Sequence, residues 1–204
     1  MKDFKKLKKY FPELSNNKID KFKNLYSIYE KINSKINLIS RKDFENFYLH
    51  HIIHSLSIVK FKIINNDKLK IIDLGTGGGF PGLPLAIYYD SNEFILIDSI
   101  KKKIKAIKKI KNLIKINNIS LINNRIENEN IKGDIILSRA VSNLSNIYKW
   151  SKNCINKKGL IINLKGGNID NELKKLNKKY KIFNLSEYYS EKFYETKKII
   201  SIQV

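Results

Sequence analysis

The residues from Ile71 to Pro84 have the types and spacing of a ligand-binding turn. A short apolar run ends in Asp73 and Leu74, a glycine-rich segment follows, and an apolar run resumes at Leu83. This order is typical of a buried strand, a tight turn and a helix N-terminus, where an α/β sheet holds a nucleotide-like ligand. Glycine is needed in such a turn because φ can be positive and because a ligand can touch backbone that carries no Cβ.

Two ligand classes use glycine turns of this kind, and both patterns fit. The dinucleotide fingerprint GxGxxG matches Gly77, Gly79 and Gly82. The acid-led turn of S-adenosylmethionine (SAM) methyltransferases instead begins at Asp73 and Gly75 and continues through the next two alternate glycines. The predicted strand ends just before Gly75, so the dinucleotide register would begin two residues late. A carboxylate at Asp73 also suits the ammonium and sulfonium of SAM better than a pyrophosphate. Register and charge favour SAM, and a dinucleotide remains the alternative.

A second acidic residue, Asp98, follows the apolar run 94–97 and lies 23 residues after Gly75. A carboxylate at the end of a second strand could accept hydrogen bonds from ribose hydroxyls. Because both ligand classes share this feature, Asp98 supports a nucleoside ligand without discriminating between them.

From residue 70 onward, short apolar runs alternate with helical patterns. We predict strands at 70–74, 94–97, 119–122, 134–137, 159–164, 182–185 and 199–204, with helices at 81–89, 101–117, 144–155 and 169–176. This order implies parallel βαβ units in an open, doubly wound sheet. The last two strands have no helix between them and therefore predict an antiparallel edge hairpin. The expected fold class is α/β, with a mostly parallel, seven-stranded sheet.

The first 60 residues carry helical patterns. One apolar face repeats at three- and four-residue steps through Phe22, Leu25, Tyr29, Ile32 and Ile36. Ser40 and Asp43 have capping-box spacing and predict a new helix, with an apolar side formed by Phe44, Phe47 or Tyr48, Ile52 and Leu56. We expect a single domain over 1–204, with a helical extension at 1–62 and an α/β core at 63–204.

The formal net charge of +21 indicates a polyanionic partner such as RNA or DNA. A composition biased toward codons rich in A and T offers the alternative explanation for the many lysines. Only Arg41, Arg125 and Arg139 are arginines. Such a bias would tend to remove arginines, so these three gain interest as functional residues.

The sequence shows no feature of secretion or of membrane insertion. No stretch has the apolar length of a membrane span, and the charged N-terminus lacks the apolar core of a signal peptide. We therefore expect a cytoplasmic protein with no membrane partner. The single cysteine, Cys154, excludes an internal disulfide and a multi-cysteine metal site, and is expected near the end of a helix as a small core residue.

Three histidines, His50, His51 and His54, fall within one predicted helix. His50 and His54 share a face, but we place no acidic ligand beside them and therefore expect no metal site. His51 is expected to contact the α/β core by hydrogen bonding.

The segment 73–86, DLGTGGGFPGLPLA, resembles the motif of the bacterial ribosomal RNA small subunit methyltransferase G family, also called glucose-inhibited division protein B. Further pieces follow in the order of that family: Asn37-Leu38-Ile39, His51-Ile52-x-x-Ser55-Leu56, Leu96-Ile97-Asp98-Ser99, Ser138-Arg139-Ala140 and Leu164-Lys165-Gly166. The resemblance covers nearly the whole chain. It implies a Rossmann-like, SAM-dependent enzyme that methylates N7 of a guanine in 16S rRNA, namely guanine 527 in the 530 loop. The 30S subunit would be the partner, and we expect a monomer.

The resemblance also implies site residues. SAM contacts transfer to Gly75, Phe80, Ile126, Glu127 and Arg139. To these we add Asp73, Gly77 and Asp98 from the turn and the second strand. Arg139 and Lys165, predicted at the ends of strands, are the candidate catalytic contacts to the substrate. Guanine N7 carries a free lone pair at neutral pH, so alignment of the reactants can supply most of the catalysis.

The chain departs from the family pattern at two places. His54 stands where the family usually has an aspartate, and Lys197 or Lys198 stands where an arginine is expected. A lysine does not reproduce the bidentate fork of an arginine. Two other functions remain open: a dinucleotide-dependent oxidoreductase, and a non-catalytic RNA-binding protein on the same fold.

Overall fold

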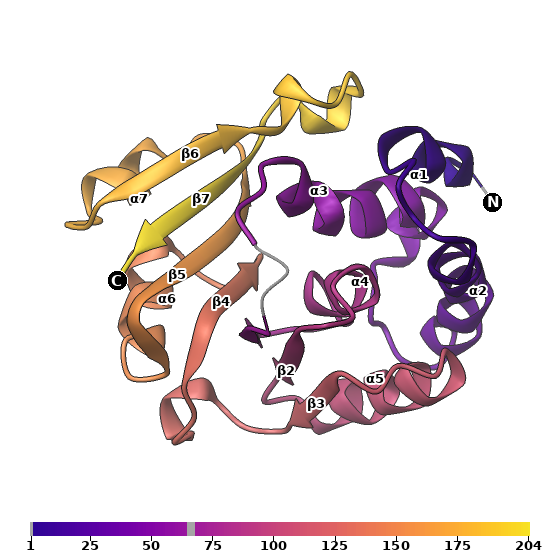
Figure 1. Cartoon of the computed structure of the whole chain (residues 1–204), viewed down its shortest axis with the longest axis horizontal. Helices are drawn as coiled ribbons and strands as arrows, with labels where there is room; N and C mark the ends of the chain where they lie inside the picture. The colour runs from indigo at the N-terminus through magenta and orange to yellow at the C-terminus, as the bar shows by residue number, and fades with distance from the viewer. Residues whose placement is uncertain (1, 65–67) are drawn as a thin grey trace.

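A seven-stranded sheet forms the centre of the protein in a computed structural model that describes residues 2–64 and 68–204 (Figure 1). Its strands, in the spatial order β3-β2-β1-β4-β5-β7-β6, are β3 Ile119–Ile122, β2 Glu93–Ile97, β1 Lys70–Leu74, β4 Gly133–Arg139, β5 Ile155–Gly166, β7 Lys197–Gln203 and β6 Tyr180–Asn184. The first five strands are mutually parallel, whereas β7 is antiparallel to both β5 and β6. The predicted fold class and edge hairpin are confirmed.

Helices cover both faces of the sheet because successive strand residues point to opposite sides. Ile71 and Leu137 pack under one layer of helices, whereas Ile72 and Ile136 pack under the other. The first layer holds α1 Phe4–Tyr10, α2 Asn16–Asn33, α3 His54–Lys60, α4 Gly82–Tyr88 and α5 Lys101–Leu113. The second layer holds α6 Leu144–Ser151 and α7 Asp170–Lys174, on the left in Figure 1.

Strand β1 lies between β2 and β4, so the chain leaves β1 toward one edge and returns on its other side at β4. In open α/β sheets this reversal of strand order creates a crevice at the carboxyl ends of the two diverging strands. The turn after β1 opens into this crevice, so the topology places the glycine-rich segment where ligands of such sheets bind.

The single helix predicted from Ser40 is wrong. A 3₁₀ segment, Arg41–Asn46, leads into a π-helical segment, Phe47–Ile53, and only then into α3. The Ser40 side chain makes no capping hydrogen bond. The Asp43 carboxylate, which the capping box would use, instead contacts the imidazole rings seven and eight residues later.

Two predicted helices end early. The helix expected over 101–117 stops at Leu113, because Lys115 adopts a left-handed φ of 53°. The helix expected over 144–155 stops at Ser151, and the Cys154 amide turns back to donate to the Ser151 carbonyl at 2.8 Å. The chain then begins β5 at Ile155, so this strand is longer than the predicted 159–164.

The helical extension reaches the glycine-rich turn directly. The Tyr29 hydroxyl donates to the Gly78 carbonyl at 2.6 Å from a fully buried position on α2. A Cβ on Gly78 would lie 2.9 Å from the Leu38 carbonyl oxygen. The first 60 residues therefore help to define the shape of the turn.

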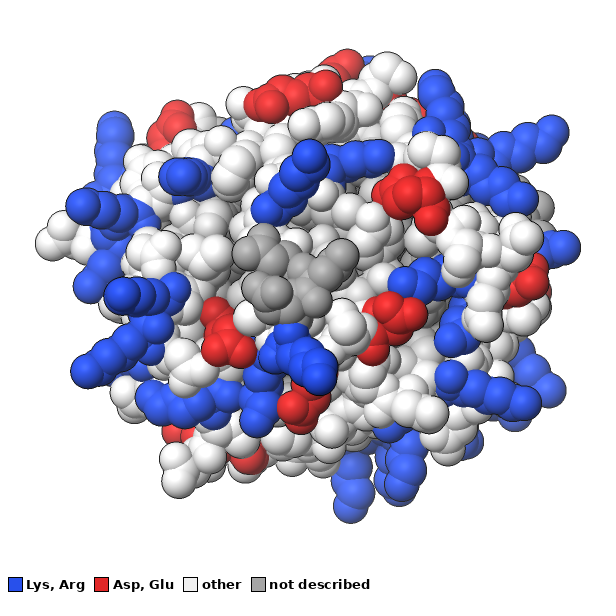
Figure 2. Space-filling view, viewed as in Figure 1, with Lys and Arg blue, Asp and Glu red and all other residues white. Residues whose placement is uncertain are grey.

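Basic side chains occupy much of the rim of the face in Figure 2, with acidic side chains between them. Among residues 2–64 and 68–204, no helix combines the length and apolar character that crossing a bilayer requires.

We predict that Leu137→Ala lowers the free energy of unfolding by about 2–5 kcal/mol, because it leaves a cavity at a fully buried position of the central strand β4. Urea titration would measure the loss. Leu113→Ala is the matched control, since that side chain is 62 % exposed and its truncation should change stability by less than about 0.5 kcal/mol. Equal losses in the two variants would contradict the described core.

Candidate functional site

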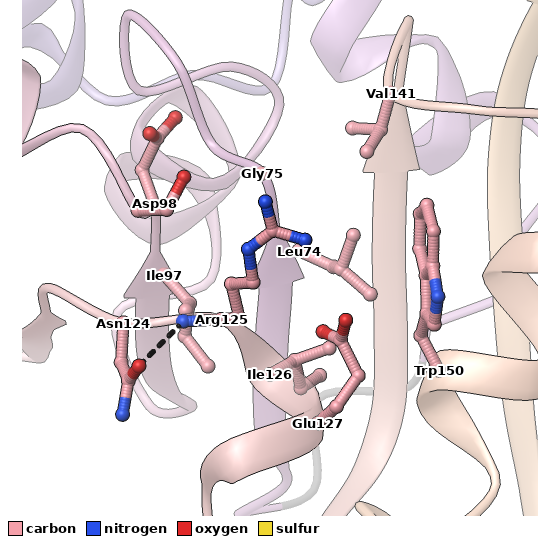
Figure 3. Close-up of a pocket in the computed structure, with 11 residues that line it drawn as sticks. Leu74, Gly75, Ile97, Asp98, Asn124, Arg125, Ile126, Glu127, Val141 and Trp150 are labelled. Atoms are coloured by element: carbon pink, nitrogen blue, oxygen red, sulfur yellow. Dashed lines mark hydrogen bonds between the residues drawn. The ribbon is translucent and has the colours of Figure 1, made fainter.

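A pocket opens at the carboxyl ends of β1, β2 and β3, beside the loop that follows β4 (Figure 3). Its wall comes from the ends of these strands, the segments that follow them, the loop after β4 and one residue of α6: Leu74, Gly75, Ile97, Asp98, Ser99, Asn124, Arg125, Ile126, Glu127, Val141 and Trp150. Four of the predicted cofactor residues, Gly75, Asp98, Ile126 and Glu127, are therefore brought together.

Gly75 lets the turn approach the loop after β4. Its φ is +66°, and a Cβ there would lie only 2.7 Å from Cγ2 of Val141. Both the backbone conformation and the close approach exclude larger residues. A side chain at this position would either displace Val141 or fill part of the pocket.

Asp98 forms one wall of the pocket and also fixes the turn. One carboxylate oxygen accepts from the Gly77 amide at 2.9 Å, and the other accepts from the Ile100 amide at 2.8 Å. Gly77 thus supports the pocket from behind without lining it. Each carboxylate oxygen retains a second lone pair for a ligand hydroxyl.

The 3₁₀ segment Ile126–Asn128 supplies an apolar surface and a carboxylate to the same pocket. Ile126 is buried, and Glu127 extends between Ile126 and Trp150 in the view of Figure 3. The Cys154 thiol donates to the Ile126 carbonyl at 3.4 Å, so this cysteine is a small buried group that supports the segment. An apolar wall with one carboxylate matches a flat base that carries an amine.

Asp73 lies beneath the turn and is fully buried. Its Oδ2 atom accepts from the Thr76 hydroxyl at 2.6 Å and from the Gly82 amide at 2.8 Å. A Cβ on Gly82 would lie 2.7 Å from that same oxygen. Burial raises the pKa of Asp73 to about 7. Asp73 therefore shapes the turn and supplies a buried acid, without lining the pocket itself.

The amide groups of the turn are largely engaged within the protein. Thr76 donates to the Ile97 carbonyl, Gly77 to Asp98, Gly79 and Phe80 to the Thr76 carbonyl, and Gly82 to Asp73. A pyrophosphate bound in the dinucleotide manner requires such amides as donors. Their engagement, together with the nearby carboxylates, disfavours a dinucleotide.

Arg139 and Phe80 form a second cluster beside the pocket. The Arg139 guanidinium lies 5.0 Å from the centroid of the Phe80 ring and donates to the His50 carbonyl at 3.1 Å. Its Nη2 atom also lies 3.1 Å from Nδ1 of His51. Burial lowers the pKa of Arg139 to about 10, so it stays cationic at neutral pH. Phe80 is 3 % exposed and packs against Tyr29, so it is a core residue under the turn and not part of the pocket wall.

The expectation that no acid accompanies the histidines is wrong. Asp43 contacts Nδ1 of His50 at 2.5 Å and Nε2 of His51 at 2.9 Å. His54 is buried and does not take part in this contact. Within the described parts of the chain, no group of three or more His, Cys, Asp or Glu side chains has an arrangement that could hold a metal ion.

Lys165 is held at the neighbouring loop. Its ammonium contacts Glu172 at 2.8 Å and donates to the Ser142 carbonyl at 2.7 Å. The same Glu172 oxygen accepts from the Leu144 amide at the start of α6. Lys165 thus secures the segment that carries Val141. Lys197 begins β7 at the same edge of the sheet, with its ammonium 4.7 Å from the Phe193 ring centroid.

Sequence reasoning missed several residues of the pocket wall. Ser99 and Asn124 follow the ends of β2 and β3, so the rule that ligands bind at carboxyl ends of strands could have identified them. The same rule would have placed Arg125, which gained interest only as a rare arginine, in the pocket wall. Trp150 comes from α6 and carries no such signal, because helix register alone does not show which residue faces a pocket.

The chain matches known proteins over almost its full length. Residues 18–200 match the sequence pattern of the family described as GidB, rRNA small subunit methyltransferase G. The ribosomal RNA small subunit methyltransferase G of Christiangramia forsetii is 44 % identical over 200 residues, which cover 95 % of this chain and 94 % of that protein. The protein of the same name from Bacteroides thetaiotaomicron is 43 % identical over 203 residues, with coverages of 96 % and 98 %.

Solved structures show the same fold at low sequence identity. A SAM-dependent methyltransferase from Aquifex aeolicus superposes with a TM-score of 0.57 at 11 % identity, over 78 % of this chain and 93 % of that one. The pyocyanin biosynthetic protein PhzM gives a TM-score of 0.61 at 13 % identity, with coverages of 87 % and 62 %. The family resemblance read from the sequence motifs is confirmed, and the chain belongs to the ribosomal RNA small subunit methyltransferase G family.

Proposed function

We propose that this protein transfers a methyl group from SAM to N7 of a guanine in 16S rRNA, guanine 527 of the 530 loop, within the 30S subunit. It would act as a cytoplasmic monomer of one domain, without a metal ion. The observation that carries the proposal is the pocket at the β1–β4 reversal, whose carboxylates and engaged turn amides suit a cationic nucleoside, in a chain of this family.

The residues of the pocket fit SAM chemically. Asp98 offers acceptors for a ribose diol, and Ile126 with Glu127 offers an apolar surface and an acceptor for adenine and its amine. Gly75 and Gly77 give the turn the left-handed backbone that it needs beside the pocket, with φ values of +66° and +58°. Arg125, the cation of the pocket wall, matches the carboxylate at the amino-acid end of SAM.

The reaction needs little acid–base chemistry from the protein. SAM supplies an electrophilic methyl group, and guanine N7 supplies the lone pair that attacks it. The C–S bond breaks as the C–N bond forms, and no proton has to leave. The protein must hold the two reactants in line, which can contribute roughly 7–11 kcal/mol to lowering the barrier.

Arg139 and Lys165 have different proposed roles in this alignment. Two of the five guanidinium N–H donors of Arg139 contact the His50 carbonyl and His51, so others remain for the guanine O6 beside N7. Lys165 is tied to Glu172 and to the Ser142 carbonyl, so it acts by holding the loop after β4 in place. Phe80 would support SAM indirectly, through the turn above it and through Arg139.

The deciding experiment measures methyl transfer from labelled SAM to 30S particles that lack the modification, followed by mapping of the labelled nucleotide. Label on guanine N7 in the 530 loop is the expected result. Absence of label, or label elsewhere, would refute the proposal. SAM binding without transfer in this assay, together with full complementation of a deletion strain by Arg139→Ala, would favour the non-catalytic RNA-binding alternative.

Gly75→Ala should weaken SAM binding by tenfold or more, because the added methyl group meets Val141 at the pocket wall. Titration calorimetry would measure the dissociation constant. Gly167→Ala is the matched control, since Gly167 has a similar φ of +73° but no atom within 4 Å of the position of a Cβ. Backbone strain is therefore comparable in the two variants. Equal SAM affinities in the two variants would remove Gly75 from the proposed site.

SAM affinity should rise as the pH increases from about 6 to about 7. Burial raises the pKa of Asp73 to about 7 in the free protein, so much of this acid is protonated at pH 6. A nearby cationic ligand favours the carboxylate and lowers this pKa, so binding releases a proton and strengthens with pH, by at most tenfold per pH unit. The dependence levels off about one pH unit above this pKa, where Asp73 is already ionised in the free protein.

Calorimetry in two buffers of different ionisation enthalpy would count the released protons. Asp73→Asn keeps an acceptor for the Gly82 amide but does not titrate, so its SAM affinity should lose this dependence on pH. A wild-type affinity that stays constant across the range would show that Asp73 does not sense the charge of the ligand.

A further inference from the structure

A line of directed contacts joins the helical extension to Arg139. The Asp43 carboxylate lies 2.9 Å from Nε2 of His51, and Nδ1 of the same ring lies 3.1 Å from Nη2 of Arg139. Asp43 belongs to the 3₁₀ segment 41–46, and Arg139 is the last residue of β4. Arg139 lies 88 residues after His51 and 96 residues after Asp43 in the sequence, so only the fold brings it to them.

The chemistry of the three groups fixes the state of the histidine. Arginine is a donor only, so Nδ1 of His51 must accept its hydrogen bond. The single proton of the neutral ring then resides on Nε2, where it is donated to Asp43. This arrangement resembles the way in which a carboxylate selects one tautomer of a catalytic or metal-binding histidine.

We propose that Asp43 and His51 are positioning residues for methyl transfer, which hold the Arg139 guanidinium in place only while the His51 ring is neutral. The inference rests on the proposed function, because it assumes that Arg139 contacts the guanine. It assigns a role in the reaction to the helical extension: a part of the alignment machinery comes from residues 41–53.

The surroundings keep His51 neutral at physiological pH. Burial lowers the pKa of His51, the contact with Asp43 opposes this shift, and the positive charge of Arg139 adds to it. The titratable and charged groups around the ring are Asp43, His50 and Arg139, with His54 and Lys197 behind them. Phe47 and Phe80 complete the packing. Asp43 is the single carboxylate in this group.

Protonation of His51 would break the line at its centre. An imidazolium carries N–H groups on both nitrogens, so Nδ1–H would face the N–H donor of Arg139, and two cations would adjoin. Arg139 would keep its contact to the His50 carbonyl but lose the second anchor that fixes its orientation. Methyl transfer should therefore fall as the pH drops through the pKa of His51, which burial lowers from the ordinary histidine value.

Two substitutions of His51 separate positioning from simple packing. His51→Phe keeps a ring but removes both nitrogens, and kcat should fall by about ten- to a hundredfold, the effect of losing one hydrogen bond to a charged group. In His51→Asn the amide oxygen replaces Nδ1 as the acceptor for Arg139. This variant should recover most of kcat at neutral pH and lose the acid limb of the pH profile. SAM affinity, measured by calorimetry, should change less than kcat in both variants, since neither His51 nor Arg139 lines the pocket.

Asp43→Asn tests the first link. The variant removes the negative charge that raises the pKa of His51, so the acid limb should move to lower pH. Asp20→Asn is the matched control, because Asp20 is an exposed aspartate on α2. Its pH profile should coincide with that of the wild type.

Nitrogen-15 NMR of the three histidines gives a readout that is independent of activity. His51 should show the Nε2–H tautomer, and Arg139→Ala should raise its pKa because a neighbouring cation is removed. An Nδ1–H tautomer, or a His51→Phe enzyme with wild-type kcat, would overturn the inference. Wild-type enzyme that gives the expected NMR result but transfers no methyl group would instead refute the proposed function.

Discussion

The close approach between the Asp73 carboxylate and the Gly82 amide is the contact on which the site depends. It joins the end of β1 to the start of α4, and no Cβ fits at Gly82 because that atom would lie 2.7 Å from the carboxylate oxygen. The turn between them must therefore loop tightly, with left-handed glycines and with its amides folded back on the protein. A turn whose donors are already satisfied offers little to a diphosphate, while the carboxylates around it attract a cation. Asp73 thus fixes the shape of the turn, and the engaged amides together with the surrounding carboxylates favour a cationic ligand.

The helical extension completes this site instead of merely covering the core. The Tyr29 hydroxyl donates to the Gly78 carbonyl within the turn, and His51 contacts Arg139 beside the turn. Phe80 lies between the two contacts, with its ring packed on Tyr29 and under the Arg139 guanidinium. Because cores transmit displacement through packed side chains, a shift in the extension would be felt at the turn and at Arg139 together.

Much of the fold followed from sequence pattern, and the failures have physical causes. Strand and helix periods alternate clearly from residue 70, and the two strands without an intervening helix identified the edge hairpin. The helix from Ser40 failed because Asp43 finds imidazole partners that capping rules do not consider. Helix ends near Leu113 and Ser151 failed because a single left-handed residue or a tight turn stops a helix without a proline or glycine signal. At the site, positions that directly follow strands were predictable, whereas Trp150 and the contact of Lys165 with Glu172 depend on tertiary packing alone.

Charge acts on two length scales in this protein: a long-range field from the whole surface, and local contacts at the pocket that involve two of the arginines. The net charge of +21 creates a long-range field that favours a polyanion. Lysines supply nearly all of the positive charge, and a lysine contributes to this field from any exposed position. Within the pocket the balance reverses, since Asp98 and Glu127 line the wall and Asp73 lies below the turn. Arg125 lines that pocket and Arg139 is fixed beside it, at places where a planar fork with several donors can do what a lysine cannot. In the proposed function, the lysines would attract RNA from a distance. Arg125 and Arg139 would then align the methyl donor and the base through contacts of fixed geometry.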